Sequence, residues 1–368
     1  MRGESRPDPE SIAGGVLRYP ADHLRQFMVD VMVHLGASEP DAQATAWALN
    51  HADLRGVDSH GINMFTHNRA YVPGLKDGTV NTNPNRRIVR ETPSTALMDN
   101  DGGLGAASAT EAMELAIEKA RQVGSGFVAL RDGRHYGMAA HYPMMALPHD
   151  MIGISVCNSR PWVAPTFGAA PMIGTNPIAV AVPAGEERPF VLDMATSVVA
   201  SGKFLLARRT GKKVPVGWSQ DADGQYSDDP FAPVEGGWLL PLGGRPETSS
   251  YKGYGLGAFV DVLSGMLSGM GSSVMLNQVE GVGQWFGAWR IDGFVDAAEF
   301  KAMTDQMIRD LKATPPLDPA RPVLIPGEIE FRNTDDRRAQ GVPLHAVLVK
   351  DLEALADECG VPFPTPLA

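Results

Sequence analysis

The sequence predicts an α/β protein whose strands are spaced too irregularly for a plain series of β-α-β units. In several segments apolar residues recur every three or four positions, which is typical of amphipathic helices, whereas other short runs are continuously apolar, which is typical of buried strands. Helices and strands are intermixed along the chain, and it contains no internal repeat. With 368 residues, 43% of them hydrophobic, the chain is long enough to bury a substantial core.

The predicted helices rest on that three-to-four-residue spacing of apolar side chains. The first, residues 21–35, follows Pro20, a residue type favoured at helix starts, and the second, residues 42–54, runs up to Gly56. In chain order the further helical segments are residues 61–71, 106–122, a helix starting near His135, 198–208, 253–267, 297–311 and 346–358.

The predicted strands are short apolar runs bounded by turn residues. One or two strands fall within residues 87–98, before the turn Asn100-Asp101-Gly102-Gly103. A buried strand at 124–130 then leads through the loop 131–134 to His135. The remaining strands are expected at 152–157, 178–182, 190–192 and 285–291.

The charge balance argues against a polyanion-binding protein. The chain has 43 acidic and 32 basic residues, and its formal net charge of -11 opposes non-specific attraction to nucleic acid or to an anionic membrane surface. A long apolar stretch at 255–267 is interrupted by Asp261 and Ser264 and falls short of a bilayer span. We therefore expect a protein that binds neither nucleic acid nor a membrane.

The cysteines and the N-terminus indicate a reducing compartment. Cys157 and Cys359 are too few for a disulfide framework and too far apart for a CxxC site. Residues 1–15 carry charged side chains and no apolar run, so they do not form a secretory signal. We expect a loose tail on a soluble, cytoplasmic protein.

One glycine-rich segment resembles a dinucleotide-binding fingerprint only superficially. Gly103-Leu104-Gly105-Ala106-Ala107-Ser108 precedes a helix, but it ends in serine and no strand leads straight into the turn. A helix N-terminus packed closely on its neighbours explains these glycines equally well. We therefore do not predict a Rossmann site here.

The segment Asp58-Ser59-His60 has two interpretations. His60 can exchange a proton near neutral pH, and Ser59 can orient it or hold a substrate oxygen. Alternatively, Asp58 or Ser59 caps a helix that begins near Gly61, and His60 is merely exposed. The three residues are not expected to form a hydrolytic triad, because neighbours on an extended loop point in different directions.

His135 is the second candidate of this kind. It precedes Tyr136-Gly137-Met138-Ala139-Ala140, whose small residues would let a ligand approach the backbone closely. A helix starting there would offer free amides to an anion such as a pyrophosphate. A packed or surface histidine is the alternative. His141 is six residues away, off the spacing of a helical metal pair, so we expect no zinc site.

Two further motifs place polar groups at the ends of predicted strands, where ligands of α/β proteins often bind. They are Gly174-Thr175-Asn176-Pro177 and Asp193-Met194-Ala195-Thr196-Ser197. Each is also ordinary turn chemistry when taken alone. Lys203 and Lys252 are candidate partners for a carboxylate or phosphate, although most lysines are solvated surface residues.

Five segments in order carry a family resemblance. They are Asp58-Ser59-His60-Gly61-Ile62, His135-Tyr136-Gly137, Gly174-Thr175-Asn176-Pro177, Asp193-Met194-Ala195-Thr196-Ser197 and Lys252-Gly253-Tyr254-Gly255-Leu256. Together they resemble the malate/L-lactate dehydrogenase family, which is distinct from Rossmann-type lactate dehydrogenase. That family includes malate, sulfolactate and ureidoglycolate dehydrogenases and piperideine-2-carboxylate reductase. The resemblance extends from about Tyr19 to Leu344.

The resemblance implies a sulfolactate dehydrogenase-like fold, which is a non-Rossmann α/β fold that binds a nicotinamide cofactor. This fold has a mixed sheet and a helical part built from both chain ends. The resemblance also implies a homodimer. It divides the chain into an N-terminal tail at 1–19 and a helical, substrate-binding part at 20–125 with the Asp-Ser-His-Gly loop. A nicotinamide-binding domain at 126–295 follows. The C-terminal helical part at 296–368 is expected to pack with the N-terminal part.

The resemblance also implies hydride transfer between NAD or NADP and a small 2-hydroxy or 2-oxo acid, without a metal. An imidazole takes the alcohol proton as the hydride leaves, and returns it in the reverse reaction. The matching positions make His135 the general acid/base and His60 with Ser59 the orienting or relay pair, with His60 as the alternative principal acid/base. The cofactor-contacting positions are His135, Tyr136, Gly137, Met138, Ala139, Ser159, Asp193, Met194, Ala195 and Lys252.

One position departs from the family pattern. Three residues after Gly61 the family usually has an arginine, which can clamp a substrate carboxylate, whereas this chain has Met64 after Asn63. Arg160 or Arg55 is a candidate replacement cation. The substrate-binding candidates are Thr175, Arg160, Asn63 and Met64. A larger or less acidic substrate, a 2-imino acid, or a non-catalytic binding role are the alternatives.

Overall fold

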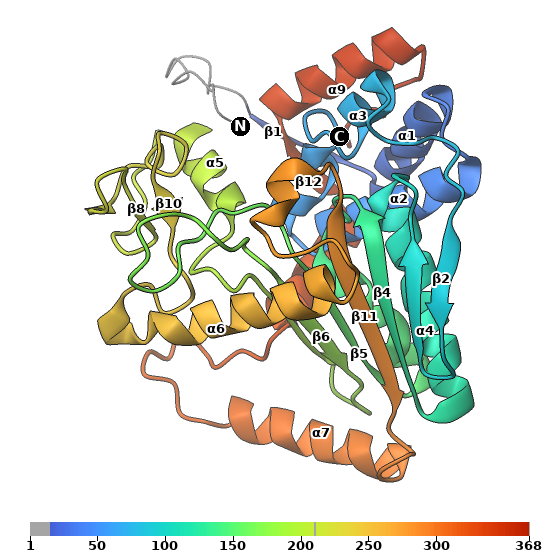
Figure 1. The fold of residues 1–368 in the computed structure, drawn as a ribbon, viewed down its shortest axis with the longest axis vertical. Helices are drawn as coiled ribbons and strands as arrows, with labels where there is room; N and C mark the ends of the chain where they lie inside the picture. Colours follow the sequence, from blue (N-terminus) through green and yellow to red (C-terminus); the bar gives the residue numbers. More distant parts are fainter. Residues whose placement is uncertain (1–14, 210, 368) are drawn as a thin grey trace.

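A mixed seven-stranded sheet organises the chain, whose computed structural model describes residues 15–209 and 211–367. The strand order is β2-β3-β4-β11-β5-β6-β7 (Figure 1). The β3–β4 pair is parallel and the other neighbouring pairs are antiparallel. The strands span Arg87–Glu91 (β2), Thr95–Asp99 (β3), Ser125–Gly133 (β4), Val282–Arg290 (β11), Met151–Cys157 (β5), Ile178–Val182 (β6) and Phe190–Met194 (β7). The α/β fold with a mixed sheet is confirmed.

The strand directions bring several chain segments to one edge of the sheet. Strand β11 is antiparallel to both β4 and β5, so β4 and β5 run in the same direction. Strand β6 is likewise antiparallel to both β5 and β7. The carboxyl ends of β3, β4, β5 and β7 therefore lie at the same edge, which we call the carboxyl edge. Ligands of open α/β sheets commonly bind outside this edge.

One face of the sheet is covered by helix α4, Gly105–Val123, and by the 3-10 segment η5, Pro143–His149 (Figure 1). The alanines of α4 that face the sheet are fully buried and let the helix approach the strands closely. They are Ala109, Ala112, Ala116 and Ala120. A Cβ on Gly105 would lie 2.3 Å from the backbone oxygen of Arg134, so the glycines before α4 serve close packing. The interpretation of this segment as a packed helix start is confirmed.

A second core joins the two ends of the chain. Strand β1, Val16–Tyr19, pairs antiparallel with β12, Val342–His345. Helices α1, α2, α3 and α9 pack around this pair, and their buried side chains form one cluster. These helices span Ala21–His34 (α1), Glu39–Leu54 (α2), Val72–Asp77 (α3) and Ala346–Cys359 (α9).

A third, smaller unit stands beside the sheet. Its strands are Ser219–Gln220 (β8), Tyr226–Ser227 (β9) and Trp238–Leu239 (β10), and helix α5, Ser201–Arg209, packs against them through the buried Phe204. Helix α6, Ser250–Val260, continues into a π-helical turn at Asp261–Met266 and crosses the front of the sheet (Figure 1).

The remaining two helices lie far apart. Helix α7, Ala297–Lys312, follows β11 and lies at the edge opposite the carboxyl edge (Figure 1). Its Asp305 accepts hydrogen bonds from the backbone of residues 185–187. Helix α8, Glu328–Gln340, packs instead on α2.

These contacts divide the chain differently from the sequence-based boundaries. Strand β3 and helix α4, expected in the helical part, belong to the core of the sheet. Residues 16–19, expected in the tail, form β1, while residues 1–14 of that tail lie outside the described residues. The segment 296–368 is not one unit, because α7 packs on the β6–β7 side and α9 on the helical part.

Two predicted helices are absent from the described chain, and the local chemistry explains both. The prediction of a helix starting near His135 is wrong. Gly137 has a φ of 78°, which is not a helical conformation, and the chain then forms 3-10 turns at Ala139–His141 (η4) and in η5. The helix over 61–71 is also wrong. There the Asn68 side chain accepts the N–H of Ala70, a local turn that competes with a helix.

Candidate active site

The carboxyl edge collects most of the segments selected from the sequence. His135 follows β4, Ser159 follows β5, and Ala195 follows β7, while Thr175 and Asn176 precede β6. The segment with Ser59 and His60 comes from the helical part instead, in a 3-10 turn, Asp58–His60 (η2), after α2. The candidate site therefore lies where the helical part meets the sheet.

His60 and His135 face one another in this site. Their ring centroids are 5.5 Å apart and the ring planes differ by 25°, a stacked arrangement. Ser59 Oγ lies 2.8 Å from His60 Nδ1. Asp58 instead forms an ion pair with Arg337. No side-chain cap is formed at η2 or at the following turn Ile62–Met64 (η3), so the capping interpretation of Asp58 and Ser59 is wrong. Asp58 is therefore not aligned with the other two residues, although the neighbouring side chains of Ser59 and His60 do contact one another.

Tyr71 is a member of the site that the sequence analysis missed. Its hydroxyl oxygen lies 2.6 Å from His135 Nδ1, and the hydroxyl donates to the backbone oxygen of His135 at 3.2 Å. A hydroxyl that donates there is free to accept the Nδ1–H of His135, which leaves Nε2 unprotonated in the neutral ring. The Gly137 N–H lies 3.3 Å from Nδ1 and would favour the tautomer with the proton on Nε2. This contact is longer than the 2.6 Å between Nδ1 and the Tyr71 hydroxyl oxygen.

The signal for Tyr71 in the sequence was weak. A buried tyrosine hydroxyl usually finds a hydrogen-bond partner, but the sequence placed Tyr71 at the end of a helix that does not form. Tyr71 is fully buried in the structure. Burial raises the pKa of its hydroxyl, so Tyr71 remains neutral.

Both imidazoles are held in their neutral form. Each residue as a whole is partly exposed, but its imidazole is surrounded by protein. This desolvation lowers the pKa of His60 to about 4. The pKa of His135 is lowered to about 3. Desolvation is the main cause, and electrostatic interaction with the neighbouring His60 is the smaller one. A neutral imidazole is the form that can accept a proton.

The expected cofactor positions fall into two groups at the carboxyl edge. In the first, Asp193 accepts the N–H of Ala140 at 2.9 Å, which joins β7 to the chain after His135. Desolvation by the surrounding protein raises the pKa of Asp193 to about 6, although part of the side chain is exposed. The side chains of Tyr136, Met138 and Ala139 are buried in the core of the sheet, so only their backbone faces this region.

The second group joins the ends of β5 and β6. The Ser159 N–H donates to the Asn176 side chain at 3.1 Å, and the Ser159 hydroxyl accepts the N–H of Thr175 at 3.2 Å. Asn176 in turn donates to the backbone oxygen of Gly257 in α6. This network links two predicted site residues, Ser159 and Thr175, to α6.

Helix α5 reaches the site from the third unit. A Cβ added to Gly202 would lie 2.8 Å from the Cβ of Ser59, so the start of α5 packs directly on the Ser59–His60 segment. Lys203 and Lys252 are both exposed, and within residues 15–209 and 211–367 no hydrogen bond fixes either side chain at the two histidines.

Of the two candidate replacements for the missing arginine, Arg160 is engaged elsewhere, whereas Arg55 interacts electrostatically with Asp193. Arg160 donates to the backbone oxygens of Leu276 and Val279. Arg55 is buried, with its guanidinium 4.6 Å from the ring of Phe331. Met64 is partly buried against the core of the helical part, beside the partly exposed Asn63.

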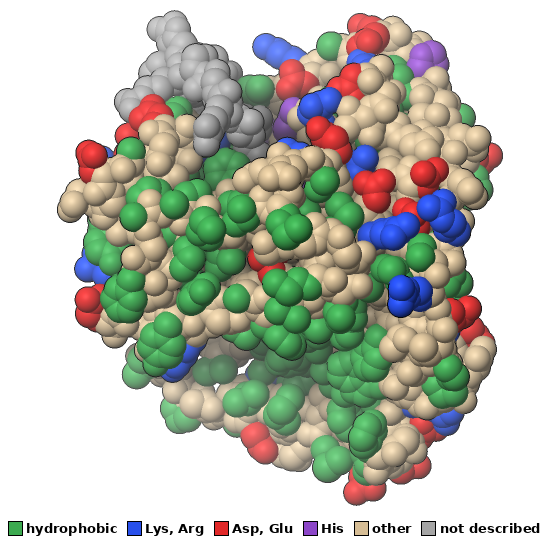
Figure 2. Space-filling model, viewed as in Figure 1, with side chains coloured by type: hydrophobic (Ala, Val, Ile, Leu, Met, Phe, Trp, Pro, Cys, Tyr) green, Lys and Arg blue, Asp and Glu red, His purple; other side chains and the backbone are tan. Residues whose placement is uncertain are grey.

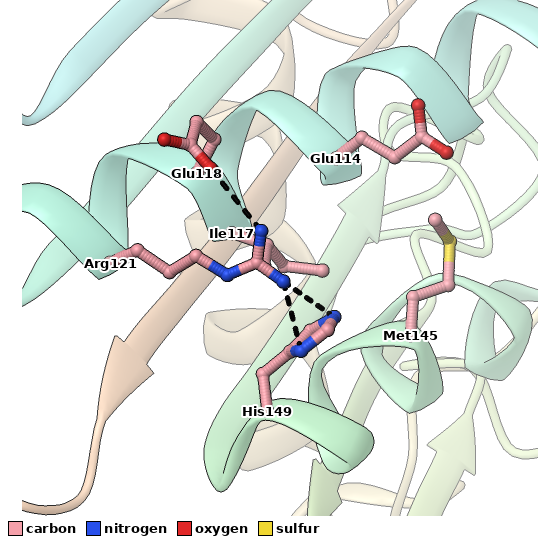
Figure 3. Close-up of a pocket in the computed structure, with 6 residues that line it drawn as sticks. All are labelled: Glu114, Ile117, Glu118, Arg121, Met145 and His149. Atoms are coloured by element: carbon pink, nitrogen blue, oxygen red, sulfur yellow. Dashed lines mark hydrogen bonds and ion pairs between the residues drawn. The ribbon is translucent and has the colours of Figure 1, made fainter.

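Other titratable clusters lie away from this site. A surface pocket between α4 and η5 is lined by Glu114, Ile117, Glu118, Arg121, Met145 and His149 (Figure 3). Its Arg121 is already paired with Glu118 and His149. His141 is buried and lies 2.9 Å from His51, Nδ1 to Nδ1. In the described part of the chain, no three acidic, histidine or cysteine side chains form a metal-binding group, and no helix is long and apolar enough to cross a bilayer.

Comparisons with known proteins agree with this geometry. The family model described as malate/L-lactate dehydrogenase matches residues 19–353. The chain is 42% identical to malate dehydrogenase of Pyrococcus horikoshii over 350 residues, which cover 94% of this chain and 96% of that protein. It is 38% identical to L-sulfolactate dehydrogenase of Methanocaldococcus jannaschii, with 92% and 96% covered. A solved malate dehydrogenase of Entamoeba histolytica superimposes with a TM-score of 0.90 at 33% identity, covering 95% of this chain and all (100%) of that one.

Proposed function

Because this chain belongs to the malate/L-lactate dehydrogenase family, we propose that it transfers a hydride between a nicotinamide nucleotide, NAD or NADP, and a small 2-hydroxy acid. The observation that carries the proposal is the apposition of His60 and His135 at the carboxyl edge. Relatives named as malate and sulfolactate dehydrogenases support this substrate class.

The groups at the carboxyl edge fit a nicotinamide nucleotide. Ser159 and Thr175 offer hydroxyls, Asp193 offers a carboxylate, and the backbone after His135 runs alongside them. Such a mixture of hydroxyl, carboxylate and backbone groups suits the ribose and amide of a nucleotide. When bound, the nicotinamide supplies or accepts the hydride.

His135 carries the proton in this proposal. Tyr71 occupies Nδ1, so Nε2 is the atom that exchanges a proton with the substrate hydroxyl. During oxidation Nε2 accepts the hydroxyl proton, and during reduction it returns that proton to the forming alkoxide. Ser59 orients His60, whose ring lies against His135 and positions the substrate.

Supporting features concern the compartment and the assembly. Cys157 and Cys359 are both free and buried, in keeping with the proposed cytoplasmic location. Large apolar side chains are exposed on α6 and the segment after it, and Figure 2 shows hydrophobic side chains gathered over α6 and around the hollow beneath it. The most exposed are Tyr251, Phe259, Met266, Leu267 and Met275.

We propose that a second copy of the chain covers this apolar face. The sheet adds half-buried apolar side chains on strands that contact the π-helical turn after α6, namely Phe127, Ile152, Ile154, Trp285 and Trp289. Monomeric proteins rarely expose apolar patches beyond a few hundred Å². Twofold dimers bury the same surface of both copies, so one apolar face is sufficient for a dimer.

Replacing His135 with alanine should lower kcat for a 2-hydroxy acid about 10²- to 10⁴-fold, the usual contribution of a general acid/base. Steady-state rates with NADH or NADPH and a panel of 2-oxo acids measure this. Binding of the reduced cofactor, followed by its fluorescence, should persist. His149→Ala, at the exposed end of η5, is the matched control. Full turnover by the His135 variant would assign the proton to another group, and His60→Ala would then show whether it is His60.

Tyr71→Phe removes the hydroxyl next to His135 Nδ1 without changing the size of the ring. We expect kcat to fall about tenfold, because loss of one hydrogen bond to a charged ring costs roughly 1.5 kcal/mol or more. The KM for the cofactor should change little. Unchanged kcat would show that Tyr71 does not hold the reactive tautomer.

The pH dependence should follow the lowered pKa of His135. Oxidation needs the neutral ring of His135. Its kcat/KM should therefore show no loss from protonation of His135 between about pH 8 and pH 5.5. The lower limit of this range lies below the ordinary histidine pKa of about 6.5. Reduction needs the protonated ring, so its kcat/KM should rise about tenfold for each unit by which the pH is lowered over the same range. An acid limb for oxidation at or above pH 6.5 would contradict the lowered pKa.

Phe259→Glu tests the dimer, because a charge at the centre of an apolar interface is costly to bury. Light scattering after gel filtration should give the mass of a dimer for the unmodified chain and a monomer fraction for the variant. Ile88→Glu, at an exposed position on the edge strand β2, is the control and should remain dimeric. A monomeric unmodified chain at micromolar concentration would refute the proposal.

A further inference from the structure

The turn that carries Ser59 and His60 is held by two side chains from outside it. It follows the end of α2 and forms only short 3-10 turns, η2 and η3. The ring of His60 nevertheless has to lie against His135, which belongs to the sheet. Its position therefore depends on what fixes the turn to the rest of the protein.

Asp53, near the end of α2, is the first of these side chains. It is 2% exposed, and its two carboxyl oxygens lie 2.9 and 3.1 Å from the N–H of Ile62. A Cβ on Gly61 would lie only 1.8 Å from Asp53 Oδ1. Gly61 is thus required for the backbone to approach this carboxyl group, and the hydrogen bond fixes the chain directly after His60.

Arg337, on α8, is the second. Its guanidinium donates to the backbone oxygen of Asp53 at 2.6 Å and forms an ion pair with Asp58, directly before Ser59. The side chain is mostly buried at the carboxyl-terminal end of α2, where a cation is favoured by the helix dipole. Nearby on α8, Asn333 donates to the backbone oxygen of Arg55.

We propose that Asp53 and Arg337 are positioning residues that fix the Ser59–His60 turn against His135. Asp53 holds the turn after His60, and Arg337 holds it before Ser59. Within residues 15–209 and 211–367, the side-chain hydrogen bonds of Asp53 and Arg337 are made to Ile62, Asp53 and Asp58 and not to either ring. The inference rests on the proposed dehydrogenase function, in which His60 orients the substrate.

The electrostatics of Asp53 indicate which substitution should preserve its role. Burial raises the pKa of Asp53 to about 8, opposed by the Ile62 N–H, so its carboxyl group is largely neutral at pH 7. An asparagine has the same shape as a neutral carboxyl group and keeps one carbonyl oxygen for the Ile62 N–H. Alanine removes that acceptor.

A double-mutant cycle tests the proposal, with Asp53→Ala and Asp53→Asn each made in the unmodified chain and in a His60→Ala background. Asp53→Ala should lower kcat/KM about 30-fold, since a 1 Å misplacement can cost about 10²-fold. Asp53→Asn should stay within about threefold of the unmodified chain. In the His60→Ala background, Asp53→Ala should change kcat/KM less than about threefold, because it acts through His60.

Two measurements separate positioning from a general loss of structure. Fluorescence of the bound reduced cofactor should show unchanged affinity, because the carboxyl edge is not altered. If Asp53→Ala does not fold, Arg337→Met gives the same cycle, with Arg332→Met as control because Arg332 forms an ion pair with Glu328 on the exposed side of α8.

Three results overturn the inference: equal losses in both backgrounds, an Asp53→Asn loss as large as that of Asp53→Ala, or full activity of Asp53→Ala. The failure of the proposed function looks different. In that case the unmodified chain itself neither oxidises nor reduces the nicotinamide with any acid of the panel, whereas an enzyme that needs His60 but not Asp53 refutes only the positioning role.

Discussion

The pairing of β11 with both β4 and β5 is the constraint on which the candidate site depends. Strand β11 comes late in the chain and lies antiparallel between two strands from its first half. It therefore aligns β4 with β5 and places His135 and Ser159 at one edge. Although η4 and η5 connect β4 to β5 in the chain, the shared pairing with β11 sets the register of the two strands.

A second long-range contact supplies the other half of the site. The end of the chain returns to its beginning through the β1–β12 pair, and α8 is thereby placed against α2. Arg337 then reaches Asp53 and Asp58, about 280 residues earlier in the chain, with separations of 284 and 279 positions. The geometry of His60 thus depends on both chain termini as well as on the sheet.

These long separations along the chain explain what the sequence could and could not predict. The α/β class and most long helices followed from local periodicity, and His60, Ser59 and His135 followed from ordered motifs. Tyr71, Asp53 and Arg337 escaped notice because nothing in their own neighbourhood marks them; each acquires its role from a residue that the fold brings close. Helix α8 was missed for a related reason: only Thr334 of its residues is buried, so it lacks the apolar stripe that reveals a helix.

The two histidines also constrain one another. A charge on His60 lowers the pKa of His135, so a proton on one ring disfavours a proton on its neighbour. Protein around both rings adds to this penalty, because neither charge is fully solvated. Near neutral pH both rings are therefore neutral, and a proton taken up by one ring disfavours a second proton on the other. In the proposed reaction one proton moves with each hydride, so one proton-carrying group is sufficient and the second imidazole is free to orient the substrate while remaining neutral.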